Sequence, residues 1–200
     1  IDGTGRTLVP AFVDPHVHLR TPGQEHKENL ETGTAAAAAG GYCAVLAMPN
    51  TDPVLDSAEL LRSLLHDAAG RARIPFGFVP AITRGLNGED LTDMAALRAE
   101  GAAGFTDDGR PVVSAAMLRK ALQYQRLTGG TLALHEEDPV LSGRGAMHEG
   151  EGSALVGWDG GAGDQLVDGE GERVALAVEG QVDGEAAEVA GCAGCDLGAD

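Results

Sequence analysis

The stretch LVPAFVDPHVHLR, residues 8–20, decides how this chain is predicted to fold. It begins with an apolar segment of strand length over residues 8–14 and continues into two histidines and an arginine at the carboxyl end of that strand. Residues two apart in an extended segment point the same way, so His16 and His18 can share one metal ion. A single His-x-His pair is more often solvated or packed in a core, so a metal site needs support from the rest of the chain.

Apolar segments of strand length alternate with longer segments of helical period along the first 138 residues. Strands are expected over 8–14, 42–50, 74–82, 102–109 and 131–138, and helices over 26–40, 56–70, 91–101 and 114–130. Asp56 and Glu59 have the spacing of a capping box at the start of the second helix. Four successive strand–helix units with apolar strands predict a parallel sheet that is covered on both faces.

The placement of polar residues distinguishes a barrel from a doubly wound sheet. Such residues end four of the five expected strands: His16 and His18, Asn50, Asp107 and Asp108, and His135. Barrels assemble their sites at that end from several strands, whereas a doubly wound sheet concentrates its signal in a glycine-rich first turn. The nearest such pattern, GTGRT over 3–7, precedes its strand. We therefore expect an α/β fold that forms the amino-terminal half of a (β/α)8 barrel.

The polar residues at two of these strand ends also have ordinary structural explanations. Asp107 and Asp108 could form a turn or cap the helix that follows, although this accounts for one aspartate more readily than for both. Asn50 could orient a ligand amide or carboxylate, or it could belong to the turn before Pro53.

Arg20 is suited to binding a substrate carboxylate through two parallel hydrogen bonds. The alternative is a surface salt bridge with Glu25 or Glu28. His135 ends an apolar strand and is followed by acidic residues, which makes it a further candidate metal ligand.

The composition excludes several kinds of partner. The net charge of −17 argues against nucleic acid and anionic membranes, because both require Lys and Arg to displace counterions. Three cysteines do not make a disulfide framework, and Cys43 lies in an apolar run, so we expect a buried thiol in a reducing compartment. No secretory signal opens the sequence, and a cytoplasmic location is expected.

Four segments together resemble one enzyme family. These segments are VDPHVHLR, MPNTDP, GFTDDGRPV and ALHEEDPVLSGRGAMHEGEGSALVG, at residues 13–20, 48–53, 104–112 and 133–157. In this order and spacing they are similar to the bacterial type I dihydroorotases of the amidohydrolase superfamily, over about residues 7–157. The resemblance implies a zinc-dependent cyclic amide hydrolase that interconverts dihydroorotate and N-carbamoyl-L-aspartate in pyrimidine biosynthesis.

The resemblance also implies a role for each matching residue. The family binds two zinc ions per site, with His16 and His18 on the first, His135 on the second, and one aspartate bridging them. Asp108 is favoured as the bridge and Asp107 is the second choice. The substrate carboxylate would be held by Arg20 and Asn50 with help from His18. No catalytic residue is assigned, because the family's proton-shuttling aspartate has no match in this chain.

Two other functions remain open. Hydantoinase-like cyclic amidases share the first motif, but they place a bridging lysine where this chain has GFTDDG. A non-catalytic relative that binds aspartate transcarbamoylase is the alternative from another class, and intact metal ligands speak against it. A homodimer is also compatible with the resemblance.

The composition changes near Gly157. Residues 157–200 carry eleven acidic residues against one basic residue, together with eleven glycines. We expect residues 1–10 to be a remnant of a flanking β-domain, 11–157 to be the first half of the barrel, and 158–200 to be an unassigned tail. A reading-frame error, an acidic disordered segment and a divergent second half are the three explanations, and the first is favoured. The chain alone is expected to be poorly stable, inactive, and open at the edge of its fifth strand.

Overall fold

The computed structural model describes residues 3–142, 147–148, 150–157, 160–161 and 174–176. Four strand–helix units and a fifth strand come first: β1 (Phe12–Val17), α1 (Leu30–Ala39), β2 (Tyr42–Ala47), α2 (Ala58–Ala68), β3 (Phe76–Phe78), α3 (Met94–Ala99), β4 (Phe105–Thr106), α4 (Ala115–Thr128) and β5 (Leu132–His135). A 3₁₀ helix, η1 (Arg84–Leu86), precedes α3. Five short elements follow: α5 (Pro139–Ser142), β6 (Met147–His148), α6 (Glu151–Val156), β7 (Gly160–Gly161) and β8 (Val174–Leu176).

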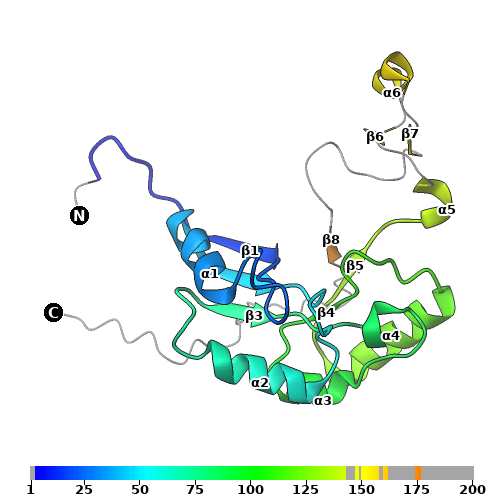
Figure 1. Cartoon of the computed structure of the whole chain (residues 1–200), viewed down its shortest axis with the longest axis horizontal. Coiled ribbons are helices and arrows are strands. Elements are labelled where there is room, and N and C mark those ends of the chain that lie inside the picture. The colour runs from blue at the N-terminus through cyan, green and yellow to red at the C-terminus, as the bar shows by residue number, and fades with distance from the viewer. Residues whose placement is uncertain (1–2, 143–146, 149, 158–159, 162–173, 177–200) are drawn as a thin grey trace, which may run out of the picture.

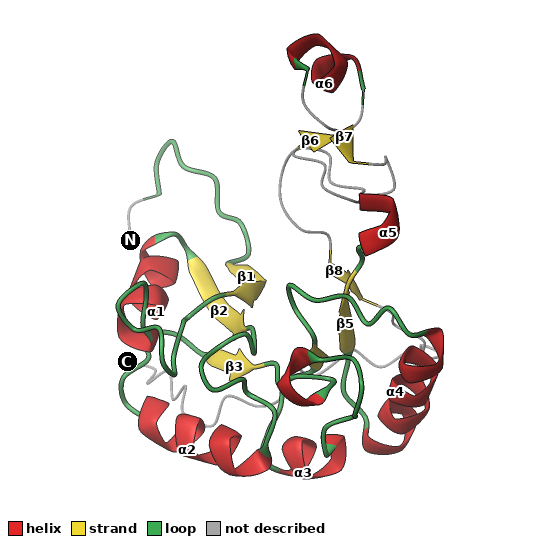
Figure 2. Cartoon of the chain, turned by 45° about the vertical axis from the view of Figure 1, so that its right-hand side comes forward, coloured by secondary structure: helices red, strands yellow, loops and turns green. Residues whose placement is uncertain are grey.

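The first five strands belong to two sheets: β1, β2 and β3 lie side by side in one (Figure 2), and β4 lies next to β5 in the other. β1 pairs with β2, β2 with β3, and β4 with β5, all in parallel. Backbone hydrogen bonds from Ala103 to Phe78 and from Thr106 to Pro80, both 2.9 Å, join the segments that contain β3 and β4. A doubly wound sheet would reverse its strand order after the first strand. The consecutive order is instead that of one arc of a barrel, and the expected α/β fold is confirmed.

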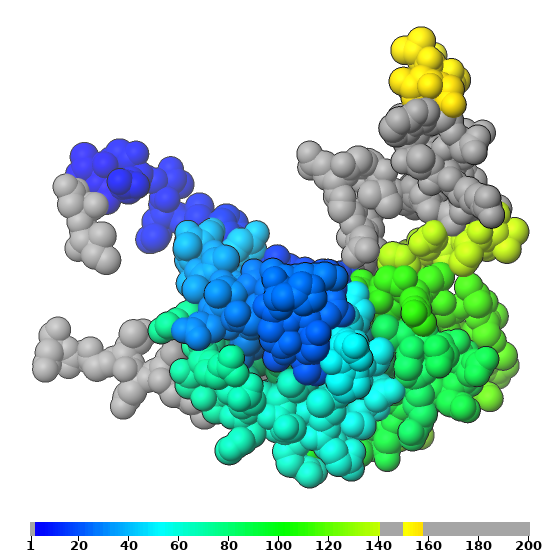
Figure 3. Space-filling view, viewed as in Figure 1, coloured from blue at the N-terminus to red at the C-terminus, as the bar shows by residue number. Residues whose placement is uncertain are grey.

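The first strand lies later in the chain than predicted. Pairing with β2 begins where Phe12 meets Tyr42, and β1 runs to Val17. Leu8 is 99% exposed, and residues 3–11 extend away from the body of the molecule (Figure 3). Pro10 has no N–H to donate to a neighbouring strand, which is consistent with pairing that starts only after it. The later strand places His16 within β1 and His18 directly after it.

Most helices begin at the side chain of a capping residue. Asn29 accepts hydrogen bonds from the first turn of α1, and Ser114 accepts one from the N–H of Met117 in α4. The predicted capping role of Asp56 is wrong: Ser57 caps α2 by accepting from the N–H of Leu60. Asp56 is not available for this role, because its carboxylate accepts from the N–H of Gly85 at 2.9 Å.

The core lies between the strands and helices α1–α4, which cover one side of the arc (Figure 1). Leu61 of α2, Leu97 of α3 and Phe105 of β4 have no exposed surface. Each such side chain stabilises the fold by about 1.5–3 kcal/mol through burial. The opposite face of the strands is less covered: Leu46 is only half-buried, and Val13 is 58% exposed.

Cys43 is exposed, so the prediction of a buried thiol is wrong. By strand alternation it shares a face with Val45, which is buried. Cys43 lies near the amino end of β2, where that face is no longer covered. The apolar run therefore predicted the strand correctly but not its exposure at that end.

The edge of β5 is paired, against expectation. β8 lies antiparallel to it, with His135 opposite Val174 and Ala133 opposite Leu176. Neighbouring strands in a barrel run parallel, so β8 does not continue the arc. Apart from residues 160–161 and 174–176, the predicted tail over 158–200 lies outside the described residues, and the division into three regions stays a prediction. Among the described helices, none has the length and apolar character needed to span a bilayer.

Candidate metal centre

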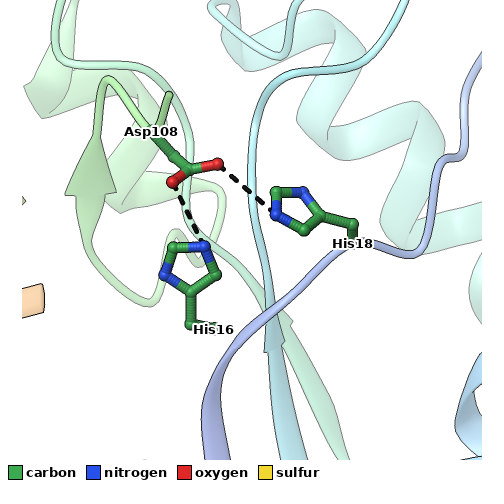
Figure 4. Close-up of side chains that lie close together, drawn as sticks. All are labelled: His16, His18 and Asp108. Carbon is green, nitrogen blue, oxygen red and sulfur yellow. Dashed lines mark ion pairs between the residues drawn. The ribbon is translucent and has the colours of Figure 1, made fainter. Parts of the chain in front are cut away.

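Three side chains from two strand ends meet at one point (Figure 4). His16 and His18 come from the end of β1, and Asp108 follows β4 by two residues. Nε2 of His16 lies 3.1 Å from Oδ1 of Asp108, and Nε2 of His18 lies 3.6 Å from Oδ2. Asp108 and His18 are ninety positions apart in the sequence. The parallel strands between them, β2 and β3, bring them together.

This donor set fits a zinc ion. Imidazole nitrogen and carboxylate oxygen are zinc ligands, and the three residues each offer one such atom within 4.8 Å of the other two. Two ligands about 2.1 Å from a tetrahedral ion lie about 3.4 Å apart, which the two distances from Asp108 bracket. Asp108 is 3% exposed, so its charge is held away from bulk water.

Asn50 joins the ligands from the two strands. Its Nδ2 donates to Oδ2 of Asp108 at 2.9 Å, and its Oδ1 lies 2.9 Å from Nδ1 of His18. Asn50 itself follows β2, the strand next to β1. The resemblance implied that Asn50 binds the substrate carboxylate, and the structure shows it in contact with two candidate metal ligands.

Asp107 takes no part in this cluster. Its carboxylate accepts hydrogen bonds from the N–H groups of Ile82 and Thr83, at 2.8 and 2.9 Å, and from the hydroxyl of Thr83. Burial raises the pKa of Asp107, and the hydrogen bonds from Thr83 and Ile82 oppose this effect. Asp108 was the favoured candidate and Asp107 the second choice, and of the two only Asp108 lies beside the histidines.

The pKa of Asp108 lies below its ordinary value. Burial acts to raise this pKa, but a hydrogen bond from His16 and the charges of His16, His18 and His135 together outweigh it. The carboxylate is therefore ionised and is able to act as a metal ligand.

His135 lies close enough to influence Asp108 but outside the compact cluster. Its Nε2 is 3.1 Å from Oε2 of Glu137, and it lines a cavity of about 650 Å³ together with Leu118 and Leu134. The structure thus places three of the four predicted metal ligands together and leaves the fourth at the neighbouring strand end.

Arg20 has an unusual backbone. Its φ of 53° is in the left-handed region, which non-glycine residues rarely adopt. In the part of the chain that the structure describes, neither Glu25 nor Glu28 forms an ion pair with Arg20; they accept instead from the N–H groups of Gly23 and Asn29. The surface salt bridge that was the alternative explanation for Arg20 is therefore absent from the described residues.

Sequence reasoning missed Thr83 and Gly23. Thr83 anchors Asp107, and the signal for it was its position directly after the third expected strand. A Cβ on Gly23 would lie 1.9 Å from the carbonyl oxygen of Asp52, so the loops after β1 and β2 approach too closely for any side chain there. The signal for Gly23 was the Pro-Gly pair at residues 22–23, which indicates a tight turn.

Known proteins share this sequence pattern. A family model described as "Dihydro-orotase-like" matches residues 5–162. A dihydroorotase of Anaeromyxobacter sp. (strain K) is 50% identical over 163 residues, covering 80% of this chain and 37% of the relative. A dihydroorotase of Desulfotalea psychrophila is 45% identical over 159 residues, covering 80% and 38%. The chain therefore spans well under half the length of these relatives.

A solved structure shares the fold. The L-hydantoinase (dihydropyrimidinase) of Arthrobacter aurescens superposes with a TM-score of 0.61 at 22% sequence identity, over 70% of this chain and 32% of that one. At this identity the likeness concerns the fold alone: the arc of strands resembles part of that structure. The two lysines of the chain, Lys27 and Lys120, are both exposed.

Proposed function

This chain belongs to the dihydroorotase-like family, and from that membership we propose that it forms part of a zinc-dependent cyclic amide hydrolase. The proposed reaction interconverts dihydroorotate and N-carbamoyl-L-aspartate, in pyrimidine biosynthesis. The relatives named dihydroorotase support the type of reaction, and the chain's share of their length makes the activity of the whole protein a proposal.

The convergence of His16, His18 and Asp108 is the observation that carries the proposal. Their ligand atoms lie within 4.8 Å of one another and have the chemistry that zinc prefers. These three residues would hold the first ion, and Asp108 is proposed as the bridge to a second. When bound, zinc supplies a Lewis acid that polarises an amide carbonyl and lowers the pKa of water.

His135 is proposed as a ligand of the second ion. It ends β5, the strand that pairs with β4, so it stands next to the strand end that carries Asp108. Its effect on the pKa of Asp108 supports this proximity. Its contact with Glu137 would have to change for Nε2 to face an ion.

Arg20 is proposed to bind the carboxylate of the substrate. Its guanidinium has no ion pair among the described residues, and the positive φ at this residue indicates a backbone that the fold holds in an unfavourable conformation. His18 and Asn50 are proposed to assist, as the resemblance implies. A hydantoin lacks this carboxylate, so the role of Arg20 separates dihydroorotate from the substrate class of hydantoinases.

The described residues bring only three ligand atoms into a compact set. We therefore propose that the 200-residue chain binds zinc but does not turn over dihydroorotate by itself. A homodimer, a complex with aspartate transcarbamoylase and a cytoplasmic location stay predictions.

The test is zinc binding by the purified full chain, followed by ligand binding to the zinc-loaded protein. Equilibrium dialysis is expected to show zinc uptake that His16→Ala and Asp108→Ala abolish and that His66→Ala, at an exposed helical histidine, leaves intact. Calorimetry is expected to detect dihydroorotate but not hydantoin, and to lose the signal in Arg20→Met. Zinc uptake that is indifferent to His16 and Asp108 would overturn the proposed site, and turnover by the loaded chain would overturn the proposed inactivity.

A further inference from the structure

Asn50 makes two hydrogen bonds that connect candidate ligands from different strands. Its amide nitrogen lies 2.9 Å from Oδ2 of Asp108, and its amide oxygen lies 2.9 Å from Nδ1 of His18. The amide nitrogen and the amide oxygen of Asn50 thus contact two residues that follow different strands, Asp108 after β4 and His18 after β1. This arrangement differs from the expected one, in which Asn50 serves the substrate alone.

The direction of each hydrogen bond follows from the chemistry of the groups. A carboxylate only accepts, so the end of the Asn50 amide that faces Asp108 must be the NH₂ group. The end that faces His18 is then the carbonyl oxygen, which also only accepts. Nδ1 of His18 must therefore carry a proton, and in the neutral ring this leaves the lone pair on Nε2. That Nε2 is the atom 3.6 Å from Asp108.

The backbone at Asn50 is held by the loop that follows β1. Its carbonyl oxygen accepts from Nε2 of Gln24 at 3.4 Å, and the N–H of Asp52 donates to the carbonyl of Pro22 at 3.1 Å. Gly23 lies against the Asp52 carbonyl so closely that a Cβ would overlap it. The asparagine is thus supported on the same loop that carries Arg20.

We propose that Asn50 is a positioning residue of the metal centre, which sets the tautomer of His18 and the orientation of Asp108 before an ion binds. This inference rests on the proposed function, because it assumes that His18 and Asp108 are ligands. A neutral amide suits this position: a second carboxylate at 2.9 Å from Asp108 would repel it, and an apolar side chain would offer neither contact. Partners of this kind around a metal-binding histidine fix its ring orientation and leave one nitrogen available to the ion.

The test compares Asn50→Leu and Asn50→Ala with wild type and with Asn87→Leu, a control at an exposed loop asparagine. The first readout is the His18 tautomer in the metal-free full chain, from long-range proton–nitrogen NMR of ¹⁵N-labelled protein at alkaline pH. We expect protonated Nδ1 in wild type and in the control, and a mixture of tautomers in both Asn50 variants. The second readout is the zinc dissociation constant, which should rise by about 10–100-fold in the Asn50 variants only.

The outcomes separate this inference from the proposed function. If wild type takes up no zinc, the proposed metal site fails, and the tautomer measurement still decides whether Asn50 orients His18. If wild type binds zinc but His18 carries its proton on Nε2, the role of Asn50 is overturned. The same holds if both Asn50 variants keep the wild-type tautomer and zinc affinity. Far-UV circular dichroism identifies a variant that has failed to fold, and two variants of different size guard against that outcome.

Discussion

Asp107 and Asp108 follow one another in the chain, yet their carboxylates are bound by different parts of the molecule. Asp107 accepts three hydrogen bonds from Ile82 and Thr83, whereas Asp108 contacts His16 and Asn50. The end of β4 thus secures a neighbouring loop through Asp107 and contributes Asp108 to the metal centre.

These separate roles predict that matched substitutions of Asp107 and Asp108 affect different properties, stability for the first and zinc uptake for the second. Asp107→Asn replaces one acceptor oxygen with a donor facing N–H and O–H groups in a buried site, and should lower the free energy of unfolding by about 3 kcal/mol. Asp108→Asn keeps the shape and an acceptor oxygen, so stability should change by about 1 kcal/mol or less while zinc uptake is lost. Urea unfolding and equilibrium dialysis measure the two effects. Equal losses of stability, or zinc uptake that survives Asp108→Asn, would contradict this assignment.

The contact between Gly23 and Asp52 predicts a second matched pair. Gly23 has a φ of 90°, and an added Cβ would lie 1.9 Å from the Asp52 carbonyl oxygen. Gly70 has a φ of 82° but no heavy atom within 4 Å of that position. Gly70→Ala therefore measures the cost of the backbone conformation alone, about 1 kcal/mol. Gly23→Ala adds the steric overlap and should cost about 3 kcal/mol or more.

The functional consequence of Gly23→Ala is expected at Asn50. The loop that contains Gly23 supports the backbone of Asn50 through Gln24, so displacement of the loop should weaken zinc binding as well as stability. The measurement is chemical denaturation combined with a zinc titration of both alanine variants. An equal loss of stability in Gly23→Ala and Gly70→Ala would contradict this prediction, because it would show that the loops after β1 and β2 can separate without a cost in free energy.

The sequence predicted the order of strands and helices because apolar periodicity is a local property. One of its errors came from a contact between distant segments. Asp56 had the spacing of a helix cap, but its carboxylate accepts a hydrogen bond from the N–H of Gly85. No local sequence pattern predicts this contact. Asp108 was favoured over Asp107 without knowledge of Thr83, which lies in the loop after another strand and binds Asp107.

The candidate site was predictable to the extent that parallel strands align their carboxyl ends. That rule brings His16, His18 and Asp108 together without any knowledge of side-chain contacts. It does not give the positions of side chains at the end of each strand, which is why His135 was expected beside the other ligands and is found in contact with Glu137. The direct contact of Asn50 with two ligands was beyond the same rule.

A pH dependence of stability is predicted from Asp93, which is not one of the candidate metal ligands. Hydrogen bonds from the N–H of Ala96 and from the Tyr124 hydroxyl hold the pKa of Asp93 below its ordinary value. A carboxyl group whose pKa is lowered by folding stabilises the fold above its unfolded pKa, and this contribution is lost as pH falls through the folded value. Thermal melting of wild type and Asp93→Ala should therefore differ at neutral pH and converge in acid. Asp90→Ala, at an exposed aspartate, serves as control; a difference for Asp93→Ala that persists at low pH would refute the electrostatic part of this role.

Zinc should stabilise the folded chain, because a ligand that binds only the folded state shifts the unfolding equilibrium. At a free zinc concentration of a hundred times the dissociation constant, the expected gain is about 2.7 kcal/mol, or about 5–10 °C in melting temperature for a chain of this length. A chelator should reverse the gain, and His16→Ala should abolish it, since that variant removes one of three ligands. His26→Ala, at an exposed histidine in the loop before α1, should melt as wild type does with and without the ion. A zinc response that persists in His16→Ala and disappears in His26→Ala would place the ion elsewhere and remove the physical basis for assigning the chemistry to the ends of β1 and β4.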